Sequence, residues 1–448
     1  MSAMRPGAAF VAAFVSTVSA PALAEMTATT VISTKEAGPF RGKPYQEIVV
    51  RMDGRAPGGD YSVPLTLLLP KLATDAVGVA VVDVLNTVAV GKETVLGPEP
   101  LPLARRHIGD DFLFGTGHIY VGVLWDKDAV ERLAAGHIGV PADGYTVLAD
   151  AASLARRPYL HIAAPGLAKT EPLKVIAFGF SQTGALLRSF YMEHRNSRDG
   201  ALVFDGAIVG GAGGGCFRPE SRSFEGCEGP SVDGGKVIAV LAEGDAQFAG
   251  GWERGESPNY RFVEVAGVPH IPPSVDDFRG RGLPNQNPIG FQPVMRAALA
   301  NLEMWLDGKE PPPSIGLTLG DAEPRDFYGI EVTPLAMDAD GNAEGGLRLP
   351  HMATTLPDGT HAGAPIGAYS GLAWGLGEQG FFLGLGGEFT PFPPAKLRSL
   401  YPDHATYVGL VAAAAGDLVA QRYILPEDGR AYVEAARQSA VGSLRRGR

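Results

Sequence analysis

The chain has 448 residues with a net charge of −11, and 45% of its residues are hydrophobic. This length fits one large domain or two ordinary ones with a sizeable core, and the 60 glycines and 36 prolines argue against a helical bundle. The acidic balance argues against nucleic acid or an anionic membrane as a partner, because binding to phosphate needs clustered Lys and Arg.

The first residues have the pattern of a secretory signal peptide. Arg5 gives a positive start, residues 8–18 are mostly apolar, and Ala22-Leu23-Ala24 is a small-x-small cleavage site. The alternative is a buried N-terminal strand or helix. No later run approaches the ~20 apolar residues that span a bilayer. We therefore expect a mature chain that is periplasmic or secreted.

Apolar runs and helical patterns alternate along the next part of the chain. Residues 45–52 and 61–69 predict an opening hairpin. The later runs expected to be strands are residues 78–85, 118–125, 175–178, 207–210, 237–242 and 261–266. Helical patterns cover residues 129–135, 148–156, 185–194 and 293–306. This alternation predicts an α/β fold with a mostly parallel, doubly wound sheet, in which sites form beyond the carboxyl ends of the strands.

Pro311-Pro312-Pro313 marks a change in the character of the sequence. The chain is turn-rich from there to about Pro394, and helical patterns follow over residues 406–423 and 426–438. We predict a signal peptide over residues 1–24, an α/β core over 25–310 and a C-terminal extension over 311–448. The extension is expected to be either a layer packed on the core or a cap over the site.

A serine stands at a sharp turn between a predicted strand and a predicted helix. Residues 175–178 form the apolar strand, Gly179 ends it, and Ser181 comes two residues later. The strict motif of such a nucleophile turn is G-x-S-x-G, but here Thr183 takes the place of the second glycine and Gly184 follows. Ser181 is therefore a candidate nucleophile. The alternative is a serine that only caps the helix.

Carboxylates and a histidine follow two later strands. Glu243 and Asp245 come after the strand that ends at Ala242, and His270 follows the strand that ends at Ala266. The order serine, acid, histidine is that of α/β-hydrolases. His270 would take the proton of Ser181, and a carboxylate would orient the imidazole. We prefer Asp245 as this acid, with Glu243 as the alternative.

Acyl transfer also needs amide donors for the oxyanion. The backbone of Gln182, directly after the serine, is the first candidate. The second donor is expected from the loop after residues 78–85, around Asn86 and Thr87. Trp125, at the end of the next strand, is a candidate for lining the substrate pocket, with a core position as the alternative.

Two cysteines, Cys216 and Cys227, are present in the whole chain. Export favours a disulfide between them, and two free thiols are the alternative. Neither cysteine has a histidine at ligand spacing, and the loop 338–344 fits an Asp/Asn/Gly turn better than a Ca²⁺ loop. No metal or other cofactor is expected.

The serine segment Phe178-Gly179-Phe180-Ser181-Gln182-Thr183-Gly184 resembles bacterial "α/β hydrolase domain" proteins with a G-x-S-Q-[ST]-G turn. Further similar segments are Ala242-Glu243-Gly244-Asp245, Ala266-Gly267-Val268-Pro269-His270, Asn287-Pro288, Pro311-Pro312-Pro313-Ser314 and Leu425-Pro426-Glu427-Asp428. The resemblance spans nearly the whole mature chain. It implies an α/β-hydrolase fold with Ser181, His270 and Asp245 or Glu243 as catalytic residues, and it implies that the C-terminal extension belongs to the family.

The chain departs from the family pattern near the serine. Family members commonly carry arginine where Phe180 and Ala185 stand, and N-R-G where residues 86–88 stand. A pocket that includes Phe180 would therefore suit a neutral or apolar acyl group. We expect an exported serine hydrolase that cleaves a small-molecule or short oligomeric carboxylic ester. The alternatives are a lactone, thioester or amide hydrolase on the same residues, or a catalytically silent binding protein of this fold.

Overall fold

The structure is a computed structural model that describes residues 25–56, 59–87, 100–126, 144–158, 172–213, 215–221, 223–227, 229, 232, 234–251, 254–255, 257–351, 364–377 and 380–443. The predicted signal peptide and the predicted helix over residues 129–135 lie outside these ranges. The predicted domain boundaries stay predictions. Among the described residues, no helix combines the length and apolar character needed to cross a bilayer.

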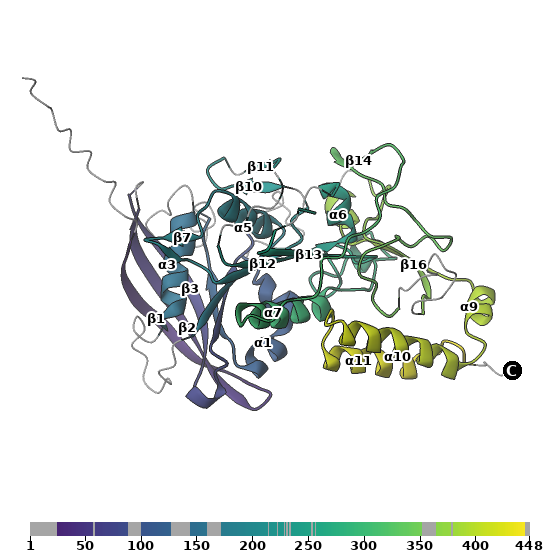
Figure 1. The fold of residues 1–448 in the computed structure, drawn as a ribbon, viewed down its shortest axis with the longest axis horizontal. Coiled ribbons are helices and arrows are strands. Elements are labelled where there is room, and N and C mark those ends of the chain that lie inside the picture. Colours follow the sequence, from purple (N-terminus) through teal and green to yellow (C-terminus); the bar gives the residue numbers. More distant parts are fainter. Residues whose placement is uncertain are drawn as a thin grey trace, which may run out of the picture.

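A nine-stranded sheet runs from one end of the molecule, at β1, to its middle, at β13 (Figure 1). Its strand order is β1-β2-β3-β5-β4-β6-β9-β12-β13. The pairs from β5 to β13 are parallel, and the pairs from β1 to β5 are antiparallel. The strands are β1 (Glu25–Phe40), β2 (Lys43–Ala56), β3 (Gly59–Pro70), β4 (Val79–Val84), β5 (Ile119–Val123), β6 (Lys174–Phe180), β9 (Gly206–Gly210), β12 (Lys236–Ala242) and β13 (Tyr260–Val265).

The apolar runs that were predicted to be strands account for most of this sheet. Every residue of β4 is buried, as expected for a strand covered on both faces. The opening hairpin of β2 and β3 is confirmed. The edge strand β1 was not predicted, because it is largely exposed and therefore lacks an apolar run; Ile32, for example, is 59% exposed.

Helices cover both faces of the sheet. One face packs against α3 (Tyr145–Arg156) and α5 (Gln182–Met192). The other face packs against α7 (Gln292–Leu306) and against a continuous helical segment made of the π-helical turn η2 (Arg105–Gly109) and α1 (Asp110–Thr116). This arrangement is the doubly wound α/β-hydrolase fold, as predicted.

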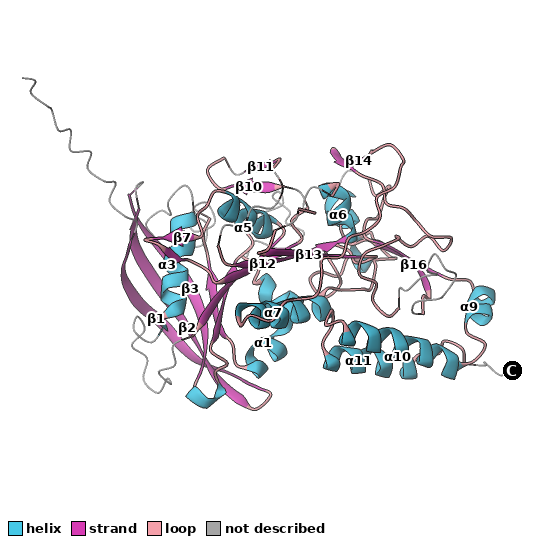
Figure 2. Cartoon of the chain, viewed as in Figure 1, coloured by secondary structure: helices cyan, strands magenta, loops and turns pink. Residues whose placement is uncertain are grey.

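The smaller elements lie around this core (Figure 2). Four two-stranded ladders pair β7 (Ser197–Arg198) with β8 (Ala201–Leu202), β10 (Cys216–Arg218) with β11 (Ser223–Glu225), β14 (Arg325–Phe327) with β15 (Ile330–Val332), and β16 (Gly367–Ser370) with β17 (Glu388–Pro391). The short helices are η1 (Ala73–Asp75), α6 (Glu243–Ala249), η3 (Arg279–Arg281), α8 (Gly380–Gly384) and α9 (Pro394–Leu400).

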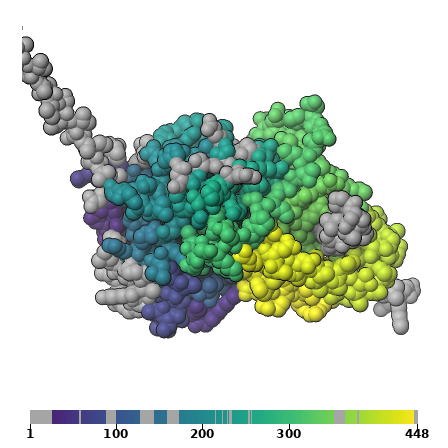
Figure 3. Space-filling view, in the orientation of Figure 1, coloured from purple at the N-terminus to yellow at the C-terminus, as the bar shows by residue number. Residues whose placement is uncertain are grey.

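The C-terminal extension packs on the core and forms one end of the molecule (Figure 3, light green to yellow). Parallel bridges join Val263 and Val265 of β13 to the extension, at Ile315 and Leu347. Its last two helices, α10 (His404–Ala420) and α11 (Pro426–Gln438), lie side by side.

A half-buried arginine ties α11 to the core. Arg296 of α7 pairs with Asp428 of α11, through Nε at 3.1 Å and through Nη2. Its Nη1 donates to the carbonyl oxygen of Ile108, in the π-helical turn, at 3.2 Å. One guanidinium therefore joins three helical segments that lie far apart in the sequence.

Candidate active site

The turn at Ser181 has the strained geometry of a nucleophile elbow. Ser181 lies between β6 and α5 with φ 60° and ψ −122°, a conformation that non-glycine residues rarely adopt. Its N–H donates to the carbonyl oxygen of Gly210 on the neighbouring strand at 2.9 Å. The surrounding sheet and helix hold the backbone in this conformation and raise the serine hydroxyl above the carboxyl edge of the sheet.

The packing explains why the second glycine stands at position 184. A Cβ on Gly184 would lie 2.3 Å from the carbonyl oxygen of Gly210, so only glycine lets α5 approach β9 this closely. A Cβ on Gly179 would lie 2.3 Å from the carbonyl oxygen of Thr183. The buried Thr183 hydroxyl accepts the N–H of Phe180 at 3.0 Å and fastens the turn. Thr183 thus has a structural role in this version of the motif.

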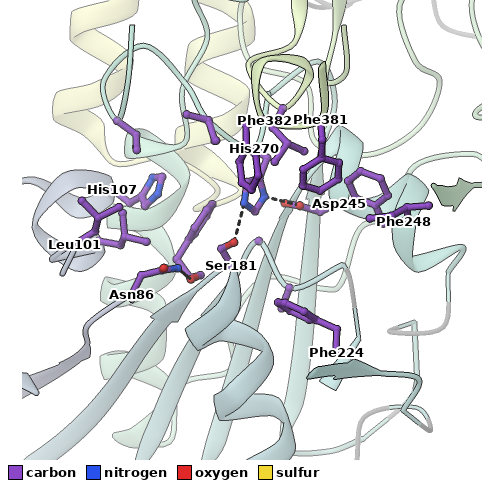
Figure 4. Close-up of a pocket in the computed structure, with 18 residues that line it drawn as sticks. Asn86, Leu101, His107, Ser181, Phe224, Asp245, Phe248, His270, Phe381 and Phe382 are labelled. Atoms are coloured by element: carbon purple, nitrogen blue, oxygen red, sulfur yellow. Dashed lines mark hydrogen bonds and ion pairs between the residues drawn. The ribbon is translucent and has the colours of Figure 1, made fainter. Parts of the chain in front are cut away.

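Ser181, His270 and Asp245 form a hydrogen-bonded chain (Figure 4). His270 Nε2 lies 3.0 Å from Ser181 Oγ, and His270 Nδ1 lies 2.6 Å from Asp245 Oδ1. Asp245 lies in the first turn of α6, where its Oδ2 accepts the N–H of Ala242 at 2.9 Å. Asp245 and His270 are both buried. This is the arrangement in which an imidazole can accept the serine proton while a carboxylate stabilises the resulting cation.

Glu243 has a different position from the one that a triad acid would need. It is fully buried, and its two oxygens accept the N–H groups of Gly267 at 2.6 Å and Gly371 at 2.9 Å. Burial raises the pKa of Glu243 to about 7, against the lowering effect of these two hydrogen bonds. The structure therefore brings Asp245 to His270, and it uses Glu243 to join the histidine loop to the C-terminal extension.

Gln182, Asn86 and Thr87, the residues expected around the oxyanion, differ in how their N–H groups are bonded. The N–H of Gln182 is the first amide of α5, so it has no acceptor within its own helix. The Thr87 N–H donates to the side-chain oxygen of Gln182 at 3.1 Å, and the Asn86 N–H donates to the carbonyl oxygen of Leu101 at 3.2 Å. The Asn86 side chain lines the pocket and donates to the carbonyl oxygen of Phe180 at 3.0 Å.

A cavity of about 490 Å³ opens above Ser181. Phe224, Phe248 and Phe381 lie on one side of the Ser181–His270 pair in Figure 4, and Leu101, His107 and Asn86 lie on the other. The described lining residues are Asn86, Leu101, Leu103, His107, Phe180, Ser181, Gly211, Ala212, Phe224, Asp245, Phe248, His270, Ile271, Val275, Ile330, Phe381, Phe382 and Leu385. None of them is Lys or Arg, which agrees with the neutral pocket inferred from Phe180.

The C-terminal extension supplies part of this cavity wall. Ile330, Phe381, Phe382 and Leu385 all lie beyond residue 310, and Phe381 and Phe382 belong to the short helix α8. The extension is thus both a layer on the core and one wall of the site.

The hairpin of β10 and β11 supplies a further wall. It carries Phe224 into the cavity lining, and the structure contains a disulfide between Cys216 and Cys227 at its base. The disulfide closes the loop that holds Phe224.

Trp125 is a core aromatic and does not line the described part of the cavity. Its side chain is 2% exposed, and its Nε1 donates to the carbonyl oxygen of Leu85 at 3.0 Å. The ring packs edge-on against Phe217 with centroids 5.8 Å apart. Its position at a strand end suggested a pocket residue, but β5 ends two strands away from β6 and the ring turns into the face covered by α3 and α5.

Sequence reasoning missed several lining residues. His107 stands alone in an amphipathic segment, and no local pattern distinguishes it from a structural histidine. Phe381 and Phe382 do carry a weak signal, since an aromatic pair in a glycine-rich segment is unusual outside a core or a binding surface.

The described residues show no metal centre. No group of three or more His, Cys, Asp or Glu side chains among them is arranged to hold a metal ion. In the loop 338–344, Asp338 Oδ1 accepts the N–H groups of Asp340 at 2.8 Å and Asn342 at 3.0 Å, which is the Asx turn expected from the sequence.

Comparison with known proteins adds to this geometry. No curated protein matches the chain. Similar solved structures include a glucuronoyl esterase from Solibacter usitatus, at 13% identity over 50% of this chain and 69% of that one, with a TM-score of 0.29. They also include the cell wall degrading esterase LipA from Xanthomonas oryzae, at 13% identity over 41% of this chain and 49% of LipA, with a TM-score of 0.27. TM-scores this low carry no information on the substrate of this chain. The model of the alpha/beta hydrolase domain family, however, matches residues 105–434, and the chain belongs to that family.

Proposed function

We propose that this protein is an exported serine hydrolase that cleaves a carboxylic ester through an acyl-enzyme intermediate. The observation that carries the proposal is the chain from Ser181 Oγ through His270 to Asp245, with contacts of 3.0 and 2.6 Å, beneath an apolar cavity. Export is supported by the N-terminal sequence pattern and by the disulfide, which persists in oxidising compartments.

The proposed reaction uses these atoms in sequence. Ser181 Oγ attacks the ester carbonyl carbon while its proton passes to His270 Nε2, and Asp245 stabilises the imidazolium. The Gln182 N–H is the proposed first donor to the oxyanion. The backbone N–H groups of Asn86 and Thr87 are both bonded elsewhere, so the Asn86 side-chain amide, which lines the cavity, is the candidate for the second donor. His270 then protonates the leaving alcohol. A water molecule, deprotonated by His270, releases the acid and restores Ser181.

The apolar cavity favours an ester with a neutral acyl or alcohol group. Its described walls offer five phenylalanine side chains and several aliphatic ones, and no Lys or Arg among the described lining residues would attract an anionic substrate. A small molecule or a short oligomer is therefore the proposed substrate. Nucleic acid and membrane surfaces are not among the proposed partners.

The test is a labelling and turnover experiment on the purified mature chain. A fluorophosphonate probe should label the wild type, and Ser181→Ala should abolish labelling and reduce turnover of 4-nitrophenyl esters by at least roughly 10³-fold. Ser189→Ala, in the same helix but outside the described cavity lining, is the matched control and should still be labelled. Turnover that survives in Ser181→Ala would refute the proposal. Labelling without ester turnover would point to lactones, thioesters or amides, and folded protein without labelling would indicate a silent binding protein.

A further inference from the structure

Two large apolar side chains that line the cavity are also exposed to solvent. Phe224 is 51% exposed and Ile330 is 40% exposed, although phenylalanine and isoleucine are among the side chains most often buried. A single exposed apolar side chain needs no explanation, but two of them at one apolar cavity are typical of a ligand-binding surface. Because both contact the cavity and the solvent, they lie where the cavity opens. We call Phe224 and Ile330 the apolar rim.

The β10–β11 hairpin fixes the first member of the rim. Phe224 pairs with Phe217 across the ladder, and their rings meet edge-on with centroids 5.2 Å apart. Phe217 is buried and packs in turn against the core ring of Trp125. The disulfide between Cys216 and Cys227 closes the same hairpin. Phe224 therefore rests on an aromatic pair that is anchored in the core, and its exposed part stays at the cavity.

The β14–β15 hairpin of the C-terminal extension fixes the second member. Ile330 follows the two-residue turn 328–329, in which both residues have positive φ, as in the tight turns that join twisted strands closely. Its ladder partner Phe327 is fully buried, and the rings of Phe248 and Phe381 pack on Phe327 at 5.7 and 5.9 Å. Phe248 and Phe381 also line the cavity. The rim is thus continuous with the aromatic wall inside the cavity.

This wall defines what can bind between Ser181 and the solvent. Phe224, Phe248 and Phe381 lie on the same side of the Ser181–His270 pair (Figure 4). An apolar chain of an ester bound at Ser181 can therefore stay in contact with apolar side chains as far as the rim. A short chain would leave the rim in water. A longer chain would cover it and gain the free energy of removing both apolar surfaces from water.

We infer that the apolar rim selects esters that carry a long apolar chain, reaching from Ser181 past Phe248 to the mouth of the cavity. The inference rests on the proposed function and names its substrate class: esters of medium- or long-chain acids or alcohols. Each methylene that moves from water to the apolar wall should raise kcat/KM by about four-fold. Because the rim lies away from the reacting atoms, it binds ground state and transition state alike and should act on KM.

The experiment compares kcat/KM along two homologous series of dissolved esters. The acyl chain lengthens from 4-nitrophenyl acetate through the butyrate to the octanoate, and the alcohol lengthens from ethyl acetate through butyl acetate to octyl acetate. In at least one series, kcat/KM of the wild type should rise by at least about ten-fold from the butyl or butyrate member to the octyl or octanoate member, mainly through KM.

The variants remove the rim without touching the catalytic residues. Phe224→Ser and Ile330→Ser should each lower kcat/KM for the longest ester by roughly five-fold or more, with the acetate within about two-fold of wild type. Phe224→Leu keeps an apolar side chain and should retain most of the preference, and Ile330→Ser tests the rim independently if Phe224→Ser disturbs its hairpin. The matched control is Leu202→Ser, because Leu202 is 41% exposed in another two-stranded ladder, outside the described cavity lining, and it should change neither value.

Four results would overturn the inference: no rise with chain length in either wild-type series, an unchanged rise in the variant with both rim residues replaced by serine, equal losses for the acetate and the longest ester in that variant, or the same loss in Leu202→Ser. If the fluorophosphonate labels Ser181 and acetate esters are cleaved without any effect of chain length, only this inference fails. If Ser181 is not labelled and no ester is cleaved, the proposed function fails and takes this inference with it.

Discussion

Glu243→Gln gives a quantitative test of the role assigned to the buried Glu243. The ordinary pKa of a glutamate is 4.5, and burial raises that of Glu243 to about 7 in the folded protein. Between these two values the folded state binds more protons than the unfolded state, so stability falls as pH rises through this window. A difference of about 2.5 pKa units corresponds to roughly 3 kcal/mol, all of it present below pH 4.5 and lost above pH 7.

Glutamine keeps an oxygen acceptor at this position and carries no charge. We therefore expect the free energy of unfolding of the wild type, relative to Glu243→Gln, to fall by roughly 3 kcal/mol between pH 5 and pH 8. Urea unfolding at several pH values measures this difference, and ester turnover of the same variant should stay within about ten-fold of wild type, because Glu243 does not contact His270. If the difference in unfolding free energy between the wild type and Glu243→Gln did not change with pH, the raised pKa that we assign to buried Glu243 would be refuted. A loss of turnover of roughly 10³-fold or more would instead make Glu243 the triad acid.

Three further predictions follow from the site. Asp245→Asn should lower kcat by roughly 10³–10⁴-fold with an unchanged fold, because the amide cannot stabilise the imidazolium, and a near-normal kcat would contradict the assigned triad. Gly184→Ala should destabilise by about 1–3 kcal/mol in chemical unfolding, because its Cβ would lie 2.3 Å from the carbonyl oxygen of Gly210, and a neutral effect would show that the helix can move away. Replacing Cys216 and Cys227 by serine should cost roughly 3 kcal/mol and raise KM, and a loss of stability with KM unchanged would show that the β10–β11 hairpin does not shape the pocket.

The sequence predicted those parts of the molecule that local patterns encode. The buried strands are apolar runs, and the serine, the acid and the histidine follow three of them in an informative order. The sequence favoured Asp245 over Glu243 only from its place after the strand, because the two carboxylates stand in one helical turn and packing decides which one faces His270. Edge strand β1 is exposed and gave no apolar signal.

The pocket was the hardest part to predict. Its walls come from segments far apart in the sequence, from Asn86 to Leu385, and their meeting depends on the tertiary fold. His107 has no local signature. Trp125 shows the opposite case, since its position at a strand end suggested the pocket and its packing places it in the core.

The link through Arg296 bears on whether the chain can be divided into modules. Asp428 compensates the charge of Arg296, and Arg296 in turn bonds the carbonyl of Ile108 within the segment that positions the pocket wall. Removal of the last helix would take away the counter-ion of Arg296 together with part of the surface that covers it. The three prolines thus mark a change in sequence composition, while the parts of the chain on either side of them belong to one cooperatively folding unit. We expect a single calorimetric unfolding transition, and evolution of new specificity in this scaffold would have to adjust both halves together.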